Sequence, residues 1–211
     1  KPDPSRCLVE LRHICKAFGG VQAVDDISLN LYPGEVVAVL GHNGAGKSTL
    51  LNVLSGDLLP DTGAVRRPES TRLGFLRQES ELPPDRRASD VFSTHIASLI
   101  SAGELSDSEA VGLSQLGLLR PRETGKKIGD LSMGQRRRLD LALILAQRPH
   151  VLLLDEPTNH LSIALVDELT DALGATQAAV VVSTHDRQLL RDTEAWPRLS
   201  LIPTVEREVT A

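Results

Sequence analysis

Short apolar runs recur along the chain and alternate with polar or amphipathic stretches. The runs at 35–40, 151–154 and 179–183 are almost continuously apolar and rich in valine and leucine. Such runs are typical of parallel strands that are covered on both faces. Alternating apolar and polar positions at 8–13 and an extended run at 21–31 predict two more strands near the N-terminus.

The stretches between these strands predict helices. The first helical pattern follows residues 41–46 and ends at Gly56. Further helical patterns lie at about 88–101, 107–117, 133–147 and 163–173. Ser132 and Ser162 are the predicted N-caps of the last two. Residues 72–77 indicate another strand, and residues 60–63 a turn. Strands that alternate with helices imply an α/β fold with a mostly parallel sheet and right-handed crossovers.

One segment differs in character from the rest. Residues 79–130 are polar and serine-rich, which indicates a helical insertion rather than a separate domain, within a helical subdomain of about 79–147. The 211 residues are 41% hydrophobic and 24% charged, the size and balance of one soluble globular domain spanning 1–211. Because the chain begins with Lys1 and not Met, we expect it to be a fragment of a longer protein.

Charge and apolar run length exclude several classes of function. The net charge of −5 argues against binding of free duplex DNA, and the five aromatic residues are too few for a base-stacking surface. The longest apolar runs, 141–146 and 178–182, are much shorter than the ~18–20 residues that span a bilayer. With no secretory signal either, we expect a cytoplasmic protein. Cys7 and Cys15 form neither a disulfide framework nor a metal quartet.

A glycine-rich segment lies between an apolar strand and a helical pattern and fits G-x-x-x-x-G-K-[ST]. Its residues are Gly41, His42, Asn43, Gly44, Ala45, Gly46, Lys47, Ser48 and Thr49. Glycines let backbone N–H groups curl around a β-phosphate, the lysine brings charge to the β- and γ-phosphates, and the serine hydroxyl suits Mg²⁺. The alternative is a plain glycine-rich turn, but the strand and helix on either side favour binding of a nucleoside triphosphate.

Two adjacent carboxylates end the apolar run VLLLDE. At the carboxyl end of a parallel strand, Asp155 would face the ligand crevice and could hold Mg²⁺ through water, and Glu156 could polarise the attacking water as a general base. Two ordinary loop acids that cap the next helix are the alternative.

The segment Leu131, Ser132, Met133, Gly134 and Gln135 precedes three arginines and a helix rich in leucine and alanine. Arginine at a helix N-terminus is electrostatically unfavourable, which suggests that an anion is expected nearby. A plain capped helix with a solvated basic face is the alternative.

Together these motifs resemble the nucleotide-binding domain of the ATP-binding cassette (ABC) proteins, over nearly the whole chain. LSMGQ is similar to the family's signature sequence and VLLLDEP to its second Walker motif. The resemblance implies a P-loop NTPase fold with an N-terminal antiparallel β-subdomain and a helical insertion. It also implies Mg²⁺-dependent ATP hydrolysis.

The resemblance also assigns single residues. It places Gln78 at the Q-loop, as a ligand of Mg²⁺ or of the attacking water, and His185 at the switch position, as a γ-phosphate sensor. Phe18 would stack on adenine, and Val24 would lie beside the nucleotide. The alternatives are a core aromatic for Phe18, a polar loop residue for Gln78 and a structural histidine for His185.

In this family the signature sequence contacts ATP bound to the opposite domain. The resemblance therefore implies a second cassette as partner, identical or in tandem. Met133 stands where the signature usually has its first glycine, and Ser162 stands where the family usually has an aspartate that links the two sites. The second departure bears on communication between the sites.

The phrase DEPTNHL, with Gln135 followed by three arginines, looks like the ABC-F branch of soluble tandem cassettes that act on ribosomes. LSIALVDEL is similar to the second cassette of actinobacterial members, which include antibiotic self-resistance proteins. A patch at Arg136, Arg137 and Arg138, or at Arg66 and Arg67, could then contact ribosomal RNA, although a solvated helix face is an equal alternative.

Two other function classes are alternatives to a role on the ribosome. The first is the ATPase subunit of a membrane transporter, in which the helical insertion would dock a coupling helix. The second is a cassette of DNA repair or chromosome maintenance. That class needs long coiled-coil heptads, and residues 79–130 contain none.

Overall fold

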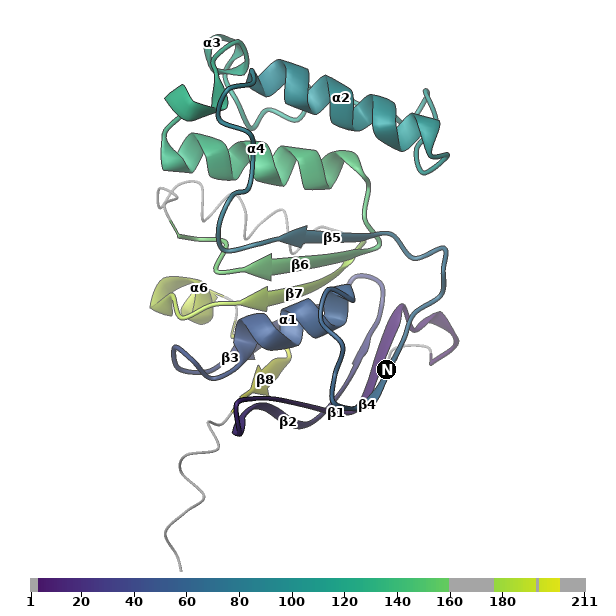
Figure 1. The fold of residues 1–211 in the computed structure, drawn as a ribbon. Helices are drawn as coiled ribbons and strands as arrows, with labels where there is room; N and C mark the ends of the chain where they lie inside the picture. Colours follow the sequence, from purple (N-terminus) through teal and green to yellow (C-terminus); the bar gives the residue numbers. More distant parts are fainter. Residues whose placement is uncertain (1–3, 160–176, 193, 202–211) are drawn as a thin grey trace, which may run out of the picture.

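The computed structural model describes residues 4–159, 177–192 and 194–201 (Figure 1). The predicted helix at about 163–173 and its N-cap Ser162 lie outside the described residues.

Parallel strands form the central sheet. They are β3 (Val36–Leu40), β5 (Leu73–Leu76), β6 (Val151–Asp155), β7 (Ala179–Ser183) and β8 (Arg198–Ser200), in the order β5-β6-β7-β3-β8. Every pairing between neighbours is parallel, and every residue of β6 and β7 is buried. The prediction of a mostly parallel sheet with central strands covered on both faces is confirmed.

A second sheet is antiparallel and contains β1 (Val9–Phe18), β2 (Val21–Leu31) and β4 (Thr62–Arg66) in the order β2-β1-β4. Gly19 and Gly20, with φ of 54° and 87°, form the turn between β1 and β2. A two-residue hairpin turn with positive φ at both positions matches the twist of the strands that it joins. The turn pairs Phe18 with Val21, so both lie at the end of this sheet.

Helices cover both faces of the parallel sheet (Figure 1). Leucines of α1 (Lys47–Ser55) pack against Val37, Val39 and Val181, and also against the antiparallel sheet. Leu141 and Ile144 of α4 (Met133–Ala146) pack on the opposite face of the sheet. There they meet Val180 and Val182, which alternate along β7 with Val181. The short helix α6 (Arg187–Asp192) follows β7.

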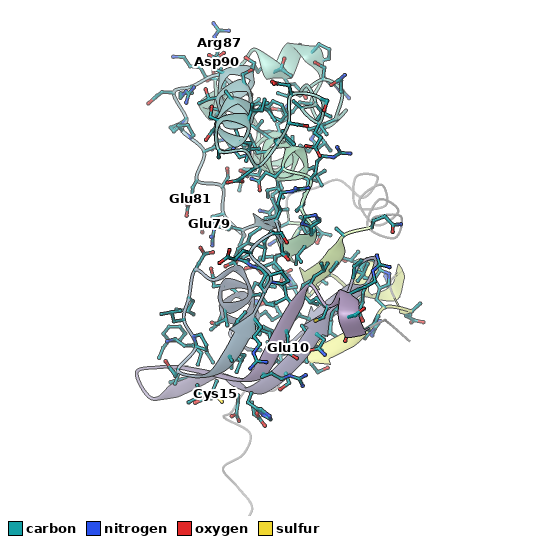
Figure 2. All side chains as sticks on the ribbon, turned by 90° about the vertical axis from the view of Figure 1, so that its right-hand side faces the viewer. Glu10, Cys15, Glu79, Glu81, Arg87 and Asp90 are labelled. Atoms are coloured by element: carbon teal, nitrogen blue, oxygen red, sulfur yellow. The ribbon has the colours of Figure 1, made fainter. Side chains whose placement is uncertain are left out.

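The helical subdomain has its own apolar cluster on the outer side of α4. It joins α2 (Ala88–Ser101) and the 3₁₀ turn η2 (Ile128–Asp130) to α4. The short helix α3 (Pro121–Thr124) contacts α2, and another 3₁₀ turn, η1 (Pro4–Arg6), precedes β1. In the side view, the segment that carries Glu79 and Glu81 runs between the sheets and this helical part (Figure 2). None of the described helices has the length and apolar character that crossing a membrane requires.

The helix predicted at 107–117 is wrong, because this segment consists of turns. Its side chains satisfy the local backbone instead: Ser106 donates from both its N–H and its hydroxyl to Glu109, and Gln115 accepts from the N–H of Gly112. Such bonds compete with helix formation, and a glycine weakens it further.

Two edge strands were not predicted. The turn expected at 60–63 gives way to β4 already at Thr62, and β8 has only three residues. Most of β4 is exposed, so its sequence carries no apolar alternation from which a strand could be recognised.

Candidate functional site

A cavity of about 520 Å³ opens at the carboxyl ends of β3, β6 and β7. Side chains and loops from five parts of the sequence line it: Phe18, Val21, Gln22, Ala23, His42, Asn43, Gly44, Gly46, Lys47, Ser48, Thr49, Gln78, Asp155, Glu156 and His185. The edge of a parallel sheet at the carboxyl ends of its strands is where open α/β folds bind ligands. The cavity brings together most of the residues that the sequence motifs singled out.

The loop between β3 and α1 depends on glycine for its course. Gly44 and Gly46 have φ of 83° and 85°, in the left-handed region that favours glycine. A Cβ on Gly46 would lie only 1.8 Å from the carbonyl oxygen of Ala23, so the loop touches the backbone of β2 directly. This course leads the chain into α1, whose N-terminus faces the cavity with unpaired N–H groups suited to an anion.

Lys47 is the first residue of α1 and only 7% exposed. Its ammonium group donates to the carbonyl oxygen of Gly41 at 2.7 Å and lies 3.6 Å from Oε1 of Glu156. These contacts hold a buried cation at the floor of the cavity, where a phosphate chain could compete for it.

Asp155 is the last residue of β6, and Glu156 follows it. The hydroxyl of Ser183 donates to Oδ1 of Asp155 at 2.6 Å. Glu156 has φ of 47°, a left-handed conformation, and its backbone N–H donates to the Ser183 carbonyl at 2.9 Å. Both carboxylates are almost completely buried and both line the cavity. The turn at Glu156 therefore presents two acids to the cavity from the end of one strand.

His185 reaches the carboxylate of Glu156 from the end of β7. Its Nδ1 lies 2.9 Å from Oε2 of Glu156, and its backbone N–H donates to the same oxygen at 3.2 Å. Over half of the His185 side chain is exposed to the cavity side, so its ring can also meet a ligand. Gln78, which follows β5, lies in the same cavity wall.

The opposite end of the cavity is formed by the antiparallel sheet. Phe18 is 50% exposed, and the ammonium group of Lys16 lies 5.6 Å from the centre of its ring. Val24 does not line the cavity, because it is 2% exposed in the core between the sheets and α1. Sequence reasoning missed the three residues that follow the hairpin turn and do line the cavity, which are Val21, Gln22 and Ala23. The two glycines after Phe18 could have indicated the hairpin.

The LSMGQ residues, 131–135, are absent from the cavity lining. They form the start of α4, where the Ser132 hydroxyl accepts from the Gln135 N–H at 3.2 Å and Gln135 Oε1 accepts from the Ser132 N–H at 2.9 Å. This capping box confirms the predicted N-cap. Met133, 60% exposed, points away from the core. Within one chain, this segment and the cavity are thus separate surfaces.

The three arginines after the signature do not form the exposed basic patch that was considered for RNA. Arg137 is 5% exposed and donates to backbone carbonyls. Arg136 donates to the carbonyls of Gly129 and Leu131. Arg66 and Arg67, the other pair considered, are both exposed.

Comparison with known proteins gives the family. Residues 24–159, more than half of the chain, match the family described as ABC transporter. The chain is 44% identical over 162 residues to the tylosin resistance ATP-binding protein TlrC of Streptomyces fradiae, covering 76% of this chain and 28% of TlrC. It is 33% identical over 185 residues to the energy-dependent translational throttle protein EttA of Haemophilus influenzae, covering 87% of this chain and 33% of EttA.

Among solved structures, the cassette MJ0796, described as a bacterial ABC transporter cassette, superposes with a TM-score of 0.76 at 26% identity, covering 92% of this chain and 94% of MJ0796. One of its structures is dimeric, and another is a post-hydrolysis state bound to ADP and Pi.

The chain belongs to the ABC transporter family and is an ATP-binding cassette. Its relatives confirm the resemblance to the ABC-F branch, and the structural neighbour confirms the predicted fold class. The chain spans only about a third or less of the length of these curated relatives.

Proposed function

We propose that this cassette hydrolyses Mg²⁺-ATP in a closed pair of cassettes and that this cycle drives an action on the ribosome. The observation that carries the proposal is the division of the motifs over two surfaces. The cavity gathers Lys47, Glu156 and His185, while the signature residues lie outside it at the start of α4.

In the proposed complex the triphosphate lies along the loop between β3 and α1. Backbone N–H groups of residues 44–48 and the ammonium of Lys47 bind the phosphates, and Phe18 stacks on the adenine at the other end. Thr49 and His42 complete the wall around the nucleotide. The cavity volume of about 520 Å³ lies within the ~300–1,000 Å³ range of ligand pockets.

The oxygen donors in the cavity fit Mg²⁺. Ser48, Gln78 and Asp155 offer a hydroxyl, an amide carbonyl and a carboxylate, which are hard ligands of the kind that Mg²⁺ takes together with phosphates and water. Mg²⁺ bound there would neutralise charge on the β- and γ-phosphates.

Glu156 is our candidate for the general base. In the proposed complex its carboxylate would lie beside the γ-phosphate, and His185 fixes its orientation through two contacts to one oxygen. It would accept the proton of the attacking water, while the His185 ring meets the γ-phosphate. Gln78 would orient the same water through its amide.

A second cassette is needed to complete each site. We expect Ser132 and Gly134 to reach a γ-phosphate only on a facing domain, because they do not line the chain's own cavity. The dimeric structure of MJ0796 supports such a pairing. We place the partner in the same polypeptide or in a second copy.

The ribosomal role is the finer part of the proposal. It is supported by the likeness to EttA, a translational throttle protein, and to TlrC, a tylosin resistance protein. It also implies a cytoplasmic location. With Arg137 buried, Arg66 and Arg67 remain from the arginines considered for RNA, as an exposed basic pair that could meet RNA phosphates.

The test uses the full-length protein with Glu156→Gln, which should close on ATP without hydrolysing it. In the presence of ATP this variant should co-sediment with ribosomes at moderate salt and dissociate at high salt. Its control is Glu156→Gln combined with Lys47→Ala, which should lose ATP and with it the ribosome. Charge reversal at Arg66 and Arg67 should weaken sedimentation without changing ATP binding.

The ATPase subunit of a membrane transporter is the second candidate. It is favoured by a groove of about 530 Å³ on the helical subdomain, with apolar side chains of Phe92, Ile96 and Leu113 in its wall. Capture of a membrane protein by the ATP-trapped variant, without sedimentation with ribosomes, would favour this function over the first.

A further inference from the structure

One side chain joins the segments that form the cavity. Arg137 lies on the second turn of α4, and its side chain points toward the parallel sheet. Its Nη1 donates to the backbone carbonyls of Arg77 and Gln78, and its Nη2 donates to those of Asp155 at 2.7 Å and Glu156 at 3.2 Å. The planar guanidinium thus contacts two segments that are far apart in the sequence. Asp155 follows Gln78 by 77 residues and Glu156 follows it by 78.

This arrangement is costly for a residue with only a structural role. Arg137 is 5% exposed, and burial lowers its pKa, an effect that Asp140 and Asp155 oppose by their charge. Among the described residues its Nε has no hydrogen-bond partner. A buried cation with one donor unpaired contributes little to stability compared with an apolar side chain of similar size. The contacts that it does make all converge on the cavity.

Asp140, one turn further along α4, is a partly buried carboxylate near the same cation. Burial raises its pKa, and the side chain of Ser80 and the charge of Arg137 oppose this effect. The helix that starts at the signature sequence is therefore fixed to the segments of Gln78 and Glu156 by the hydrogen bonds of Arg137.

We propose that Arg137 is a positioning residue for ATP hydrolysis, which holds the backbones of Gln78 and Glu156 in register with each other and with α4. The phosphate-binding loop lies outside its reach: none of its contacts involves residues 41–49. Arg137 therefore acts on the segments that carry the water-activating groups and two of the proposed Mg²⁺ ligands, and its loss should lower turnover more than it weakens ATP binding.

The geometry makes a specific demand on the side chain. Only a planar fork can donate to both loops at once, whereas lysine offers the same charge on a single nitrogen. Methionine fills much of the same volume without any donor. Arg137→Lys thus tests the planar pair of donors while the charge is kept. Comparison of Arg137→Lys with Arg137→Met then separates the effect of the charge from that of packing.

The experiment measures steady-state ATP hydrolysis and nucleotide binding of the full-length protein and these two variants. Arg137→Met should lower kcat ~10–100-fold, the cost of a small misplacement of catalytic groups, with KM for ATP within about threefold. Arg137→Lys should also lower kcat, by a smaller factor. Far-UV circular dichroism and thermal unfolding establish that each variant is folded.

The matched control is Arg72→Met. Arg72 also donates to a backbone carbonyl, that of Arg148, but at the opposite end of β5, and it should keep kcat within twofold. A folded Arg137→Met with the parent's kcat would overturn the proposal. So would a loss confined to KM. If Arg137→Met does not fold, Arg137→Lys decides, and a folded lysine variant with full kcat would overturn the role of the fork.

Discussion

Oε2 of Glu156 lies 2.9 Å from Nδ1 of His185 and accepts a second hydrogen bond, of 3.2 Å, from the backbone N–H of the same histidine. Two contacts from one residue to one oxygen fix the carboxylate, while the other oxygen lies 3.6 Å from the ammonium of Lys47. Since the carboxylate is buried, a ligand would find it already oriented.

Replacing Glu156 with glutamine should lower ATP turnover ~10²–10⁴-fold through loss of the general base. Nucleotide affinity should stay within about twofold of the parent's, because the amide keeps the shape of the side chain. Phosphate release under single-turnover conditions and nucleotide binding check the two statements. Glu81→Gln, at an exposed position outside the cavity, is the control. Turnover within twofold of the parent's would remove Glu156 from the mechanism.

Alanine at Gly46 should unfold the protein or abolish nucleotide binding, because its Cβ would lie 1.8 Å from the Ala23 carbonyl oxygen. Gly44→Ala is the matched control, with nearly the same φ but no atom within 4 Å of the new Cβ. It should cost only the ~1–2 kcal/mol of a left-handed alanine. Urea unfolding compares the two, and equal losses would show that the contact with Ala23 is not the cause.

Removal of the Ser183 hydroxyl should leave the buried Asp155 carboxylate short of one donor. We expect Ser183→Ala to lower the free energy of unfolding by ~1–3 kcal/mol, the range for an unsatisfied buried acceptor. Ser106→Ala removes a similar bond, to Glu109 at 2.8 Å, from an exposed site and should cost less. Urea titrations of both variants test this, and a Ser106 effect as large as that of Ser183 would contradict it.

Phe18→Ala should raise KM for ATP about tenfold, since base stacking on an aromatic ring is worth ~1–3 kcal/mol. The free energy of unfolding should hardly change, because half of the ring is exposed. Phe18→Trp should keep the parent's KM, and Leu59→Ala, at a more exposed apolar position, serves as the control. An unchanged KM in Phe18→Ala would place adenine elsewhere.

Acid should weaken the support of the signature sequence. The backbone N–H of Arg120 holds the pKa of Glu123 below its ordinary value of 4.5, with help from the Gln135 side chain. A carboxyl group with a lowered folded-state pKa stabilises the fold above about 4.5, and this contribution is lost as the pH falls through the folded-state pKa. The difference in unfolding free energy between the parent and Glu123→Gln should therefore shrink between pH 6 and about pH 3.5. A constant difference would contradict this.

The sequence predicted the cavity well because its motifs sit at strand ends. A parallel sheet brings the carboxyl ends of its strands to one edge, so Lys47, Asp155 and His185 had to meet once the strands at 35–40, 151–154 and 179–183 were recognised. The prediction for Val24 was wrong because its side chain is buried in the core near α1, and Ala23 before it is the last residue of β2 that lines the cavity.

The sequence could not predict the environment of Arg137. Three consecutive arginines resemble a solvated basic turn, and periodicity does not tell which of them faces the sheet. That orientation follows from how α4 packs on β5 and β6, which is a property of the tertiary structure. The turns at 107–117 failed for a different reason, because their side chains bind the local backbone in competition with a helix.

The close approach of Gly46 to Ala23 has a consequence for the choice of nucleotide. Phe18 pairs with Val21 across the hairpin turn, and Ala23 lies two residues further along β2. The contact of Gly46 with Ala23 therefore holds the phosphate-binding loop at a fixed distance from the aromatic wall of the cavity. If a base stacked on Phe18, it would fix where the phosphate chain begins, and only a chain of sufficient length would reach Glu156 and His185 in the same cavity. Discrimination between a triphosphate and a diphosphate would then depend on the length of the phosphate chain, and it would need no movement of the loop.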